Sequence, residues 1–582
     1  MKDEALLKQV TAKAQAWLSE EYDAETRREV QQMLDNPNIT ELIEAFYKDL
    51  EFGTGGLRGI MGAGTNRVNI YTVGAATQGL SNYLKMEFAD LPLIKVVIGH
   101  DCRNNSRKYA EISADIFSAN GIKVYLFDDL RPTPEISYTI RRLGCQSGII
   151  LTASHNPKEY NGYKAYWDDG GQVIAPHDKN IIAEVNKIRL VKNINFKGNK
   201  TLISTLGAET DQQFIHDLLS ISLSPEAINK QHDIKIVYTP IHGSGVHLVP
   251  AGLKAMGFTN IIHVPEQDVV SGEFPTVVSP NPEEAAALDL AVKKARETGA
   301  ELVLATDPDA DRVGIAIKNE KGEFVLVNGN QTFLLCLYYL ITNWKKSGKL
   351  TGNEYVVKTI VTVELAKAIA DSNGVEIYDC YTGFKWIAAV MRENEGKKKY
   401  IGGGEESYGF LAEDFVRDKD AVSASMLIAE IAAWAKDNGK TLYELLQDIY
   451  VEYGFSKEKG ISVVKQGKSG AEEIEAMMQQ FRKNPPKEIA GSKVVLIKDF
   501  AKLTGYDLIE NEEFTLDMPT TANVLQFFTE DNTKVSVRPS GTEPKIKFYI
   551  EVQSKVNERA GLAKAEEDAE AKIEAVRGSL GV

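Results

Sequence analysis

The sequence is poor in cysteine and lacks the paired cysteines of zinc ribbons and disulfide-stapled domains. Its 582 residues include only four cysteines, which are scattered along the chain without a CxxC pair: Cys102, Cys145, Cys336 and Cys380. This pattern argues against a zinc knot and against a secreted, disulfide-rich fold. We therefore expect the thiols to be reduced and structural.

Long hydrophobic runs are missing as well. No stretch approaches the roughly 18 apolar residues needed to cross a membrane. The first 23 residues read as a charged amphipathic helix rather than the apolar core of a signal peptide. These two absences predict a cytoplasmic protein that has no membrane partner.

Positive charge is in deficit. Lys and Arg total 67 against 82 for Asp and Glu, which gives a formal net charge of −15. A protein of this charge is a poor partner for nucleic acid or for anionic membranes. An anionic substrate would need positive charge gathered locally at its site.

The patterning that is present predicts an α/β protein of about four domains. Short apolar runs rich in β-branched residues alternate with helix-period segments, and each of three such series ends in a strand followed by Gly and polar residues. The tail has closely spaced strands and a final helix. We predict three similar α/β domains with mixed or parallel sheets and a C-terminal α+β domain around a central cleft, with bounds 1–207, 208–327, 328–450 and 451–582.

Three aspartates follow one apolar run. In "LATDPDADR", Asp307, Asp309 and Asp311 occupy every second position. Three hard oxygen ligands at this spacing suit Mg²⁺, and without a cation their mutual repulsion is unfavourable. A solvated acidic turn and an aspartyl phosphatase nucleophile are the alternatives. A calcium loop of the EF-hand type is excluded, because Arg312 and Lys318 stand where its glycine and its closing glutamate belong.

A second strand end carries a hydroxyl. "ILTASHNP" places Ser154 and His155 behind an apolar run, with Lys164 downstream. The segment matches neither the GxSxG elbow nor the Ser-x-x-Lys arrangement of acyl-transfer enzymes. Composition alone leaves a turn or capping serine open as the alternative.

Two further loops offer groups that bind sugars and phosphates. "GGGEESYG" presents Glu405 and Ser407, which can accept from and donate to hydroxyls, although a flexible turn is the alternative. "RPSGTEP" combines the fork of a guanidinium with hydroxyls and backbone N–H groups, although it also fits an ordinary hairpin connection. The candidate phosphate ligands in this second loop are Arg538, Ser540, Gly541 and Thr542.

The glycine-rich segment 51–67 matches neither the Walker A loop nor the dinucleotide fingerprint. We predict that its Arg58 contacts phosphate near Ser154. Arg103, which follows the strand in "IGHDCRNNSR", is a weaker candidate for the same role.

The four motifs "TASHNP", "DPDADR", "GGGEES" and "RPSGTEP", in this order over most of the chain, resemble the α-D-phosphohexomutase family, in particular its long bacterial branch. The resemblance implies that Ser154 is a phosphoserine that exchanges its phosphoryl group with substrate, and that the three aspartates hold Mg²⁺ together with an oxygen of that phosphoserine. It further implies sugar binding by Glu405 and Ser407. Its remaining implications are phosphate or sugar contacts from Arg312, Lys164, Gly383 and Lys385, and proton transfer by Lys419.

The expected activity is therefore interconversion of a hexose 1-phosphate and a hexose 6-phosphate, most simply of glucose, through a hexose 1,6-bisphosphate. Phosphomannomutase and phosphopentomutase activities remain open, as does a non-catalytic sugar-phosphate sensor on the same fold. The expected partner is a small phosphosugar, and the oligomeric state is left open. A helical extension of about 45 residues precedes the shared core, and we expect it to pack against the first domain.

Overall fold

The structure is a computed structural model that describes residues 2–53, 55–465, 467–540 and 545–582. The chain forms two compact units. Unit 1 comprises residues 1–329 and 383–439, and unit 2 comprises residues 330–382 and 440–582.

Unit 1 contains a mixed sheet of six strands in the order β1-β5-β4-β2-β3-β6. β2, β3, β4 and β6 run parallel, whereas β1 and β5 pair antiparallel at one side of the sheet. The strands are β1 (Gly56–Ile60), β2 (Lys95–His100), β3 (Lys123–Phe127), β4 (Ser147–Leu151), β5 (Tyr160–Trp167) and β6 (Ile203–Leu206). Every residue of β4 is buried, as expected for a strand covered on both faces.

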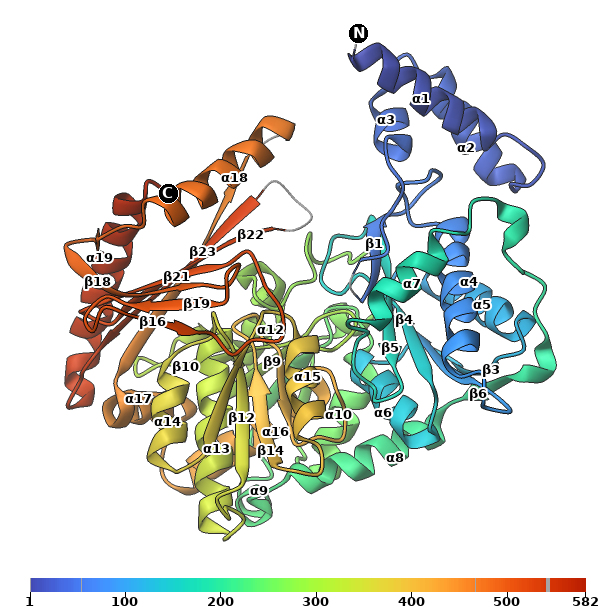
Figure 1. The fold of residues 1–582 in the computed structure, drawn as a ribbon. Helices are drawn as coiled ribbons and strands as arrows, with labels where there is room; N and C mark the ends of the chain where they lie inside the picture. Colours follow the sequence, from blue (N-terminus) through green and yellow to red (C-terminus); the bar gives the residue numbers. More distant parts are fainter. Residues whose placement is uncertain (1, 54, 466, 541–544) are drawn as a thin grey trace. The chain divides into compact units, whose positions relative to one another are not determined.

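Helices cover both faces of this sheet (Figure 1). The helices are α4 (Ile70–Glu87), α5 (Ser106–Ala119), α6 (Thr133–Leu143) and α7 (His177–Val185). α4, α5 and α7 share one apolar core, and α6 packs on the opposite face. Gly99 and Gly148 let α6 approach closely, since a Cβ there would lie 2.3 Å from Ile136 Cδ1 and 2.5 Å from Ile140 Cδ1. α6 thereby brings its first residues to the edge where β2 and β4 end.

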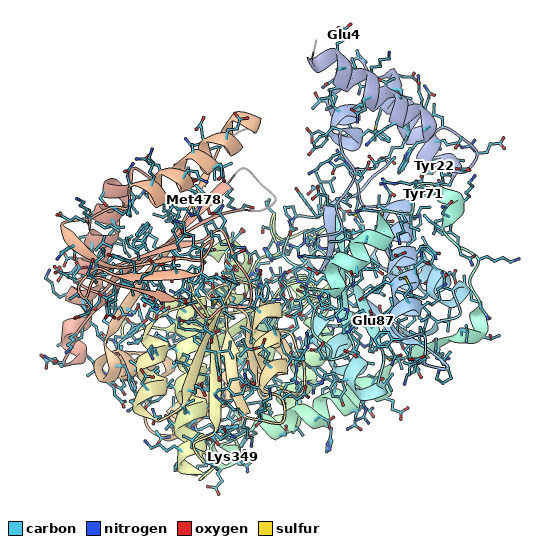
Figure 2. All side chains as sticks on the ribbon, viewed as in Figure 1. Glu4, Tyr22, Tyr71, Glu87, Lys349 and Met478 are labelled. Carbon is cyan, nitrogen blue, oxygen red and sulfur yellow. The ribbon has the colours of Figure 1, made fainter. Side chains whose placement is uncertain are left out.

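The amino-terminal extension forms three helices around a small core that also includes Ala63 and Tyr71 of the first domain. They are α1 (Lys2–Ala16), α2 (Ala24–Asp35) and α3 (Thr40–Phe46). Trp17 stacks on Tyr22, and both rings contact Tyr71 of α4. Figure 2 shows Tyr22 and Tyr71 beside each other where the extension meets α4. The prediction that the extension packs against the first domain is confirmed.

A second mixed sheet of unit 1 has the order β11-β10-β9-β7-β8. Its strands are β7 (Ile236–Thr239), β8 (Ile261–His263), β9 (Leu302–Thr306), β10 (Val313–Lys318) and β11 (Phe324–Val327). The neighbouring helices are α8 (Ala208–Leu218), α9 (Pro225–Lys230), α10 (Gly245–Met256), α11 (Pro265–Asp268) and α12 (Ala285–Thr298). Unit 1 also contains α15 (Phe384–Asn394), the hairpin of β14 (Lys399–Gly404) and β15 (Phe410–Ala412), and α16 (Ala421–Asp437).

Unit 2 joins a parallel strand pair to an antiparallel sheet. β12 (Glu354–Thr359) and β13 (Glu376–Cys380) pair in parallel and are accompanied by α13 (Gly329–Lys346), α14 (Leu365–Ser372) and α17 (Leu442–Tyr453). The antiparallel sheet has the order β16-β23-β22-β21-β18-β19-β20, with β17 paired to β18. Its strands are β16 (Phe455–Val464), β17 (Glu488–Ile489), β18 (Ser492–Asp499), β19 (Thr504–Asp507), β20 (Glu512–Thr515), β21 (Leu525–Thr529), β22 (Thr533–Pro539) and β23 (Lys545–Ser554). Its helices are α18 (Gly467–Lys483) and α19 (Leu562–Leu580).

The predicted fold class is confirmed: α/β domains with mixed sheets precede a domain built on an antiparallel sheet with helices. The strands of the third α/β series are divided between the two units, which the periodicity of the sequence did not reveal. Among the described helices, none combines the length and the apolar composition required to cross a bilayer.

Candidate active site

Ser154 lies in the loop that follows β4. Only 3% of the residue is exposed, and its φ of 52° places the backbone in the left-handed region. Its N–H donates to Thr152 Oγ1 at 2.8 Å. Its Oγ donates to Asp307 Oδ2 at 2.9 Å and lies 3.2 Å from His155 Nδ1. The hydroxyl therefore faces the acidic loop, as the sequence predicted.

The acidic loop follows β9, and its three carboxylates are buried. Asp307, Asp309 and Asp311 are at most 1% exposed, and one oxygen from each lies within 4.8 Å of the others. Asp307 Oδ1 accepts the N–H groups of Asp311 and Arg312, both at 3.1 Å, so the loop folds around this side chain. The alternative of a solvated acidic turn is wrong, because none of the three side chains reaches solvent.

Two lysines balance part of this negative charge. Lys164 Nζ lies 2.6 Å from Asp309 Oδ2 and 3.0 Å from Asp311 Oδ2, and Lys419 Nζ lies 2.9 Å from the same Asp311 oxygen. Burial alone would raise the pKa of Asp311, but the two ammonium groups hold it well below its usual range. Burial, followed by the charges of Asp309 and Asp311, raises the pKa of Asp307 well above its usual range. The charge of the loop is therefore only partly compensated by protein groups.

The donor set fits a hard divalent cation. Within the described part of the chain, Asp309 Oδ1 and Asp311 Oδ1 are buried and accept no hydrogen bond. Buried carboxylate oxygens without a donor are unfavourable unless a cation or water serves them. Carboxylate oxygens in this number suit Mg²⁺, which retains further positions for water and phosphate. Thr133 at the start of α6 fixes Asp309 in place, because its Oγ1 donates to Asp309 Oδ2 at 2.8 Å.

A cluster of cationic and imidazole groups surrounds the Ser154 hydroxyl. Arg312 Nη1 lies 3.0 Å from His155 Nδ1 and donates to Glu283 Oε1 at 3.3 Å. Burial, with the added repulsion of Arg312 and Arg58, lowers the pKa of His155 to about 2. The imidazole is therefore neutral, and its Nδ1 can accept a hydrogen bond from Arg312 Nη1. Arg58, on β1, donates to Asn156 Oδ1 at 2.9 Å, which places it beside the Ser154 loop as predicted.

Arg103 does not have the predicted phosphate-contacting role. It is 3% exposed, and its two terminal nitrogens donate to the carbonyls of Ser154, Asn156, Pro157 and Tyr160. Its Nε lies 3.3 Å from Asp101 Oδ2. Because backbone carbonyls occupy the guanidinium, Arg103 holds the loop rather than a ligand.

The sugar-binding candidates gather around Glu405, directly after β14. Glu405 is 5% exposed, and its Oε1 accepts the N–H of Gly383 at 2.7 Å. Burial raises the pKa of Glu405 to about 7, although the nearby charge of Lys419 opposes the rise. Ser407 is half-buried two residues later. Lys385 Nζ lies 5.5 Å from the centroid of the Trp386 ring, in the first turn of α15, the helix that Gly383 caps.

Lys419 is held by groups on both sides. Its Nζ lies 3.3 Å from Asp418 Oδ1, and Asp418 Oδ2 accepts the hydroxyl of Tyr166 at 2.7 Å. Burial opposes protonation, but Asp311 and Asp418 raise the pKa of Lys419 above its usual value. Lys419 is therefore a fixed cation at the acidic loop in this structure.

The fourth motif belongs to unit 2. Arg538 is in β22, and the Ser540 N–H donates to the Lys545 carbonyl at 2.7 Å at the start of β23. Gly541 and Thr542 lie outside the described residues. Arg538 and Pro539 end β22 and Lys545 begins β23, so the described ends of the segment lie in two neighbouring strands. The contact of the motif with phosphate stays a prediction.

Sequence reasoning missed several residues that shape the site: Asp101, Thr133, Thr152, Tyr166, Glu283 and Asp418. Thr133 contacts a residue 176 positions away and Tyr166 contacts one 252 positions away. No local pattern carries such information. Only Thr152 had a local signal, since a hydroxyl two residues before Ser154 can accept its N–H.

Four domain families match the chain. They are described as Phosphoglucomutase/phosphomannomutase, alpha/beta/alpha domains I, II and III, over residues 49–192, 212–322 and 328–453, and the C-terminal domain, over residues 469–575. The boundaries predicted from the sequence alone stay predictions.

Similar proteins carry mutase names. A Staphylococcus haemolyticus protein named phosphoglucomutase is 36% identical over 516 residues, which are 89% of this chain and 92% of the relative. A human protein named phosphopentomutase is 33% identical over 569 residues, which are 94% of this chain and 92% of the relative. Among solved structures, a putative phosphomannomutase from Thermus thermophilus is 21% identical and superposes with a TM-score of 0.65, covering 90% of this chain and 99% of the other. At that identity the superposition supports the fold alone.

Proposed function

This chain belongs to the phosphoglucomutase/phosphomannomutase family and is a mutase, an isomerase that transfers a phosphoryl group within its substrate, and we propose that it interconverts hexose 1-phosphate and hexose 6-phosphate, with glucose as the preferred hexose. The single observation that carries the proposal is the buried Ser154 hydroxyl 2.9 Å from Asp307 Oδ2. A nucleophile so close to three carboxylates needs a cation between its phosphate and the acidic loop.

In the proposed reaction, phosphorylated Ser154 transfers its phosphoryl group to the free hydroxyl of a hexose 1-phosphate. The bond from phosphorus to Ser154 Oγ breaks, a bond to the sugar oxygen forms, and the hydroxyl proton ends on Ser154 Oγ. The hexose 1,6-bisphosphate then reorients in the site and returns its other phosphoryl group to Ser154. The bond from phosphorus to that sugar oxygen breaks, a bond to Ser154 Oγ forms, and the Ser154 proton passes to the sugar oxygen. The net reaction is an isomerisation without loss of atoms or protons.

The residues of unit 1 take distinct parts in this proposal. Asp307, Asp309 and Asp311, with an oxygen of phosphorylated Ser154, would hold Mg²⁺, which supplies charge neutralisation for phosphoryl transfer when bound. Lys164 and Arg312 add positive charge around the transferring oxygens, and Arg58 contacts phosphate. His155 orients the serine. Lys419 is protonated beside Asp311 and Asp418, so in proton transfer it would act first as the proton donor.

Sugar recognition is assigned to Glu405 and Ser407, with Gly383 fixing the Glu405 carboxylate and Lys385 contacting sugar or phosphate. Arg538, Ser540, Gly541 and Thr542 of unit 2 are assigned to the phosphate that does not react. Because these groups would hold whichever phosphate is not reacting, Ser154 could exchange a phosphoryl group with either end of the bisphosphate.

A second candidate substrate is a pentose phosphate. The human relative named phosphopentomutase matches 94% of this chain, which is slightly more than the staphylococcal phosphoglucomutase matches. The paired glutamates of "GGGEES" favour a hexose in our interpretation, because a hexose offers one more hydroxyl to bind.

A coupled assay tests the proposal. Glucose, mannose, glucosamine and ribose 1-phosphates are compared with the wild type and with Ser154→Ala, in the presence of glucose 1,6-bisphosphate and Mg²⁺. We expect the highest kcat/KM with glucose 1-phosphate, and a phosphate mass on Ser154 that passes into product. Near-normal turnover by Ser154→Ala would remove the nucleophile assignment, and a preference for ribose 1-phosphate would replace the proposed substrate by the second candidate.

A further inference from the structure

The backbone at Ser154 is held in a conformation that a serine rarely adopts. Its φ of 52° lies in the left-handed region, which costs a residue with a Cβ on the order of 1 kcal/mol or more and persists where neighbouring contacts impose it. Both polar backbone atoms of Ser154 are bonded. Its N–H donates to Thr152 Oγ1 at 2.8 Å, and its carbonyl accepts Arg103 Nη2 at 2.6 Å.

Asp101 connects these two contacts. It follows β2, is 1% exposed, and accepts Thr152 Oγ1 at 2.6 Å through Oδ2. Because the Thr152 hydroxyl gives its proton to Asp101, its oxygen is left to accept the N–H of Ser154. Asp101 Oδ1 also accepts the Arg103 N–H at 2.9 Å and the Ser106 hydroxyl at 2.8 Å, which fixes the carboxylate itself.

Arg103 gathers the rest of the loop around one buried cation. Nη1 donates to the Pro157 and Tyr160 carbonyls at 2.8 Å and 3.0 Å, and Nη2 donates to the Ser154 and Asn156 carbonyls. The guanidinium carbon lies 5.1 Å from the ring centroid of Phe274, so an aromatic ring covers its face. A lysine cannot reproduce this arrangement, since it lacks the planar fork.

We propose that Asp101, Arg103 and Thr152 are positioning residues for the phosphoryl transfer, which hold Ser154 in the left-handed conformation that aims its Oγ at Asp307. The inference rests on the proposed function of Ser154 as the phosphoryl carrier. Among the described residues, none of the three side chains forms a hydrogen bond with Ser154 Oγ or with an oxygen of the acidic loop. The hydroxyl can therefore gain and lose phosphate while its backbone stays in place. If these contacts are removed, Ser154 Oγ should be misplaced for phosphoryl transfer, which lowers kcat, whereas the binding of sugar should change little.

Substitution of Thr152 tests this with little change of shape. Thr152→Val removes the oxygen that accepts the Ser154 N–H, whereas Thr152→Ser retains it. Thr77→Val is the matched control, because Thr77 is equally buried and its hydroxyl donates to the Val73 carbonyl on α4. For each variant, kcat and KM for glucose 1-phosphate, the rate of phosphorylation by glucose 1,6-bisphosphate from intact mass, and Tm are measured.

We expect Thr152→Val to lower kcat and the phosphorylation rate on the order of 10²-fold, as for a misplacement of about 1 Å, with KM within about twofold. Thr152→Ser and Thr77→Val should keep kcat near that of the wild type. The positioning role is overturned if Thr152→Val keeps wild-type kcat, or if its loss follows Tm alone and Thr77→Val shows the same loss.

Arg103→Lys provides a second variant should Thr152→Val fail to fold. It should show the same selective loss of kcat, and full kcat in this variant overturns the inference. Failure of the proposed function looks different. An inactive wild type, or an active Ser154→Ala, contradicts the nucleophile and the positioning role together. An active wild type with an inactive Ser154→Ala and a fully active Thr152→Val contradicts the positioning role alone.

Discussion

At the scale of single residues, the site is organised by buried charge that protein groups compensate only in part. Lys164 and Lys419 each contact Asp311, and Lys164 also contacts Asp309, whereas Asp307 accepts backbone N–H groups and the Ser154 hydroxyl. Removing one member of a buried ionic cluster is costly, because the remaining charge has no partner. The lysines therefore support the fold of the acidic loop as well as the proposed chemistry.

Lys164→Met is predicted to lower Tm in the absence of divalent cations and to lower mutase turnover by at least about tenfold. Mg²⁺ should recover much of the lost Tm, since a cation can replace the missing ammonium beside Asp309 and Asp311. Thermal unfolding with and without Mg²⁺ and a turnover assay check this. Lys158→Met is the control, because Lys158 lies in the Ser154 loop before β5, is half-exposed and pairs only with the exposed Glu273 in the ion pairs of the described residues. Equal Tm values for Lys164→Met and wild type without cation would contradict the prediction.

At the scale of elements, close packing overrides local propensity in α4. Gly79 lies in the interior of this helix, where alanine normally stabilises by about 1 kcal/mol. A Cβ at Gly79, however, would lie 2.6 Å from the backbone N and 2.7 Å from the Cα of Val185 in α7. The contact between α4 and α7 therefore requires the glycine.

We predict that Gly79→Ala destabilises the protein by about 1–3 kcal/mol, the usual cost of overpacking. Gly578→Ala in α19 is the matched control, since a Cβ there meets nothing within 4 Å, and it should be neutral or stabilising by up to about 1 kcal/mol. Urea unfolding of both variants measures the difference. A stabilising Gly79→Ala would show that α7 moves away easily.

In unit 2, two glutamates face each other across a strand pair. Glu458 of β16 lies opposite Glu551 of β23. Burial, and then the charge of Glu551, raises the pKa of Glu458 from 4.5 to about 7. Directly opposed like charges destabilise a strand pair.

The consequence is a dependence of stability on pH. The folded state binds the Glu458 proton more tightly than the unfolded state does. The free energy of unfolding therefore decreases as pH rises from about 4.5 to about 7. Glu458→Gln should remove that loss, so its advantage over wild type grows between pH 5 and pH 8. Urea unfolding at several pH values measures it, with the exposed Glu512→Gln as control. A difference between Glu458→Gln and wild type that does not change with pH contradicts the assignment.

At the scale of the whole molecule, binding of a divalent cation should stabilise unit 1 specifically. A ligand that binds only the folded state at 100 times its Kd contributes about 2.7 kcal/mol. We predict that Mg²⁺ raises Tm and slows amide exchange in segments 152–164 and 307–313, and that Asp309→Asn with Asp311→Asn abolishes both effects. NaCl of matched ionic strength is the control. An equal rise of Tm in the double variant, with its fold verified by circular dichroism, would remove the cation site.

Much of the architecture follows from local patterns. The mainly apolar, fully buried strands β4 and β9 end where hydroxyl and carboxylate residues begin, so the strand ends that carry Ser154 and Asp307 are readable from the chain. The prediction for Arg103 was wrong because an arginine after a strand looks alike whether it binds a ligand or backbone carbonyls. The division of the third strand series between two compact units had no signal either, since periodicity describes elements and not their packing.

By itself, the sequence determined the kinds of elements, the residue types offered at each strand end and the order of the four motifs, because hydrophobic period and short-range chemistry are local properties. Only the tertiary structure decided that Ser154 meets Asp307 across 153 residues of chain, that Lys164 and Lys419 share Asp311, and that Arg103 serves the loop. The physical reason is that burial, pKa and hydrogen-bond partnership depend on distances between residues remote in sequence, which packing alone establishes.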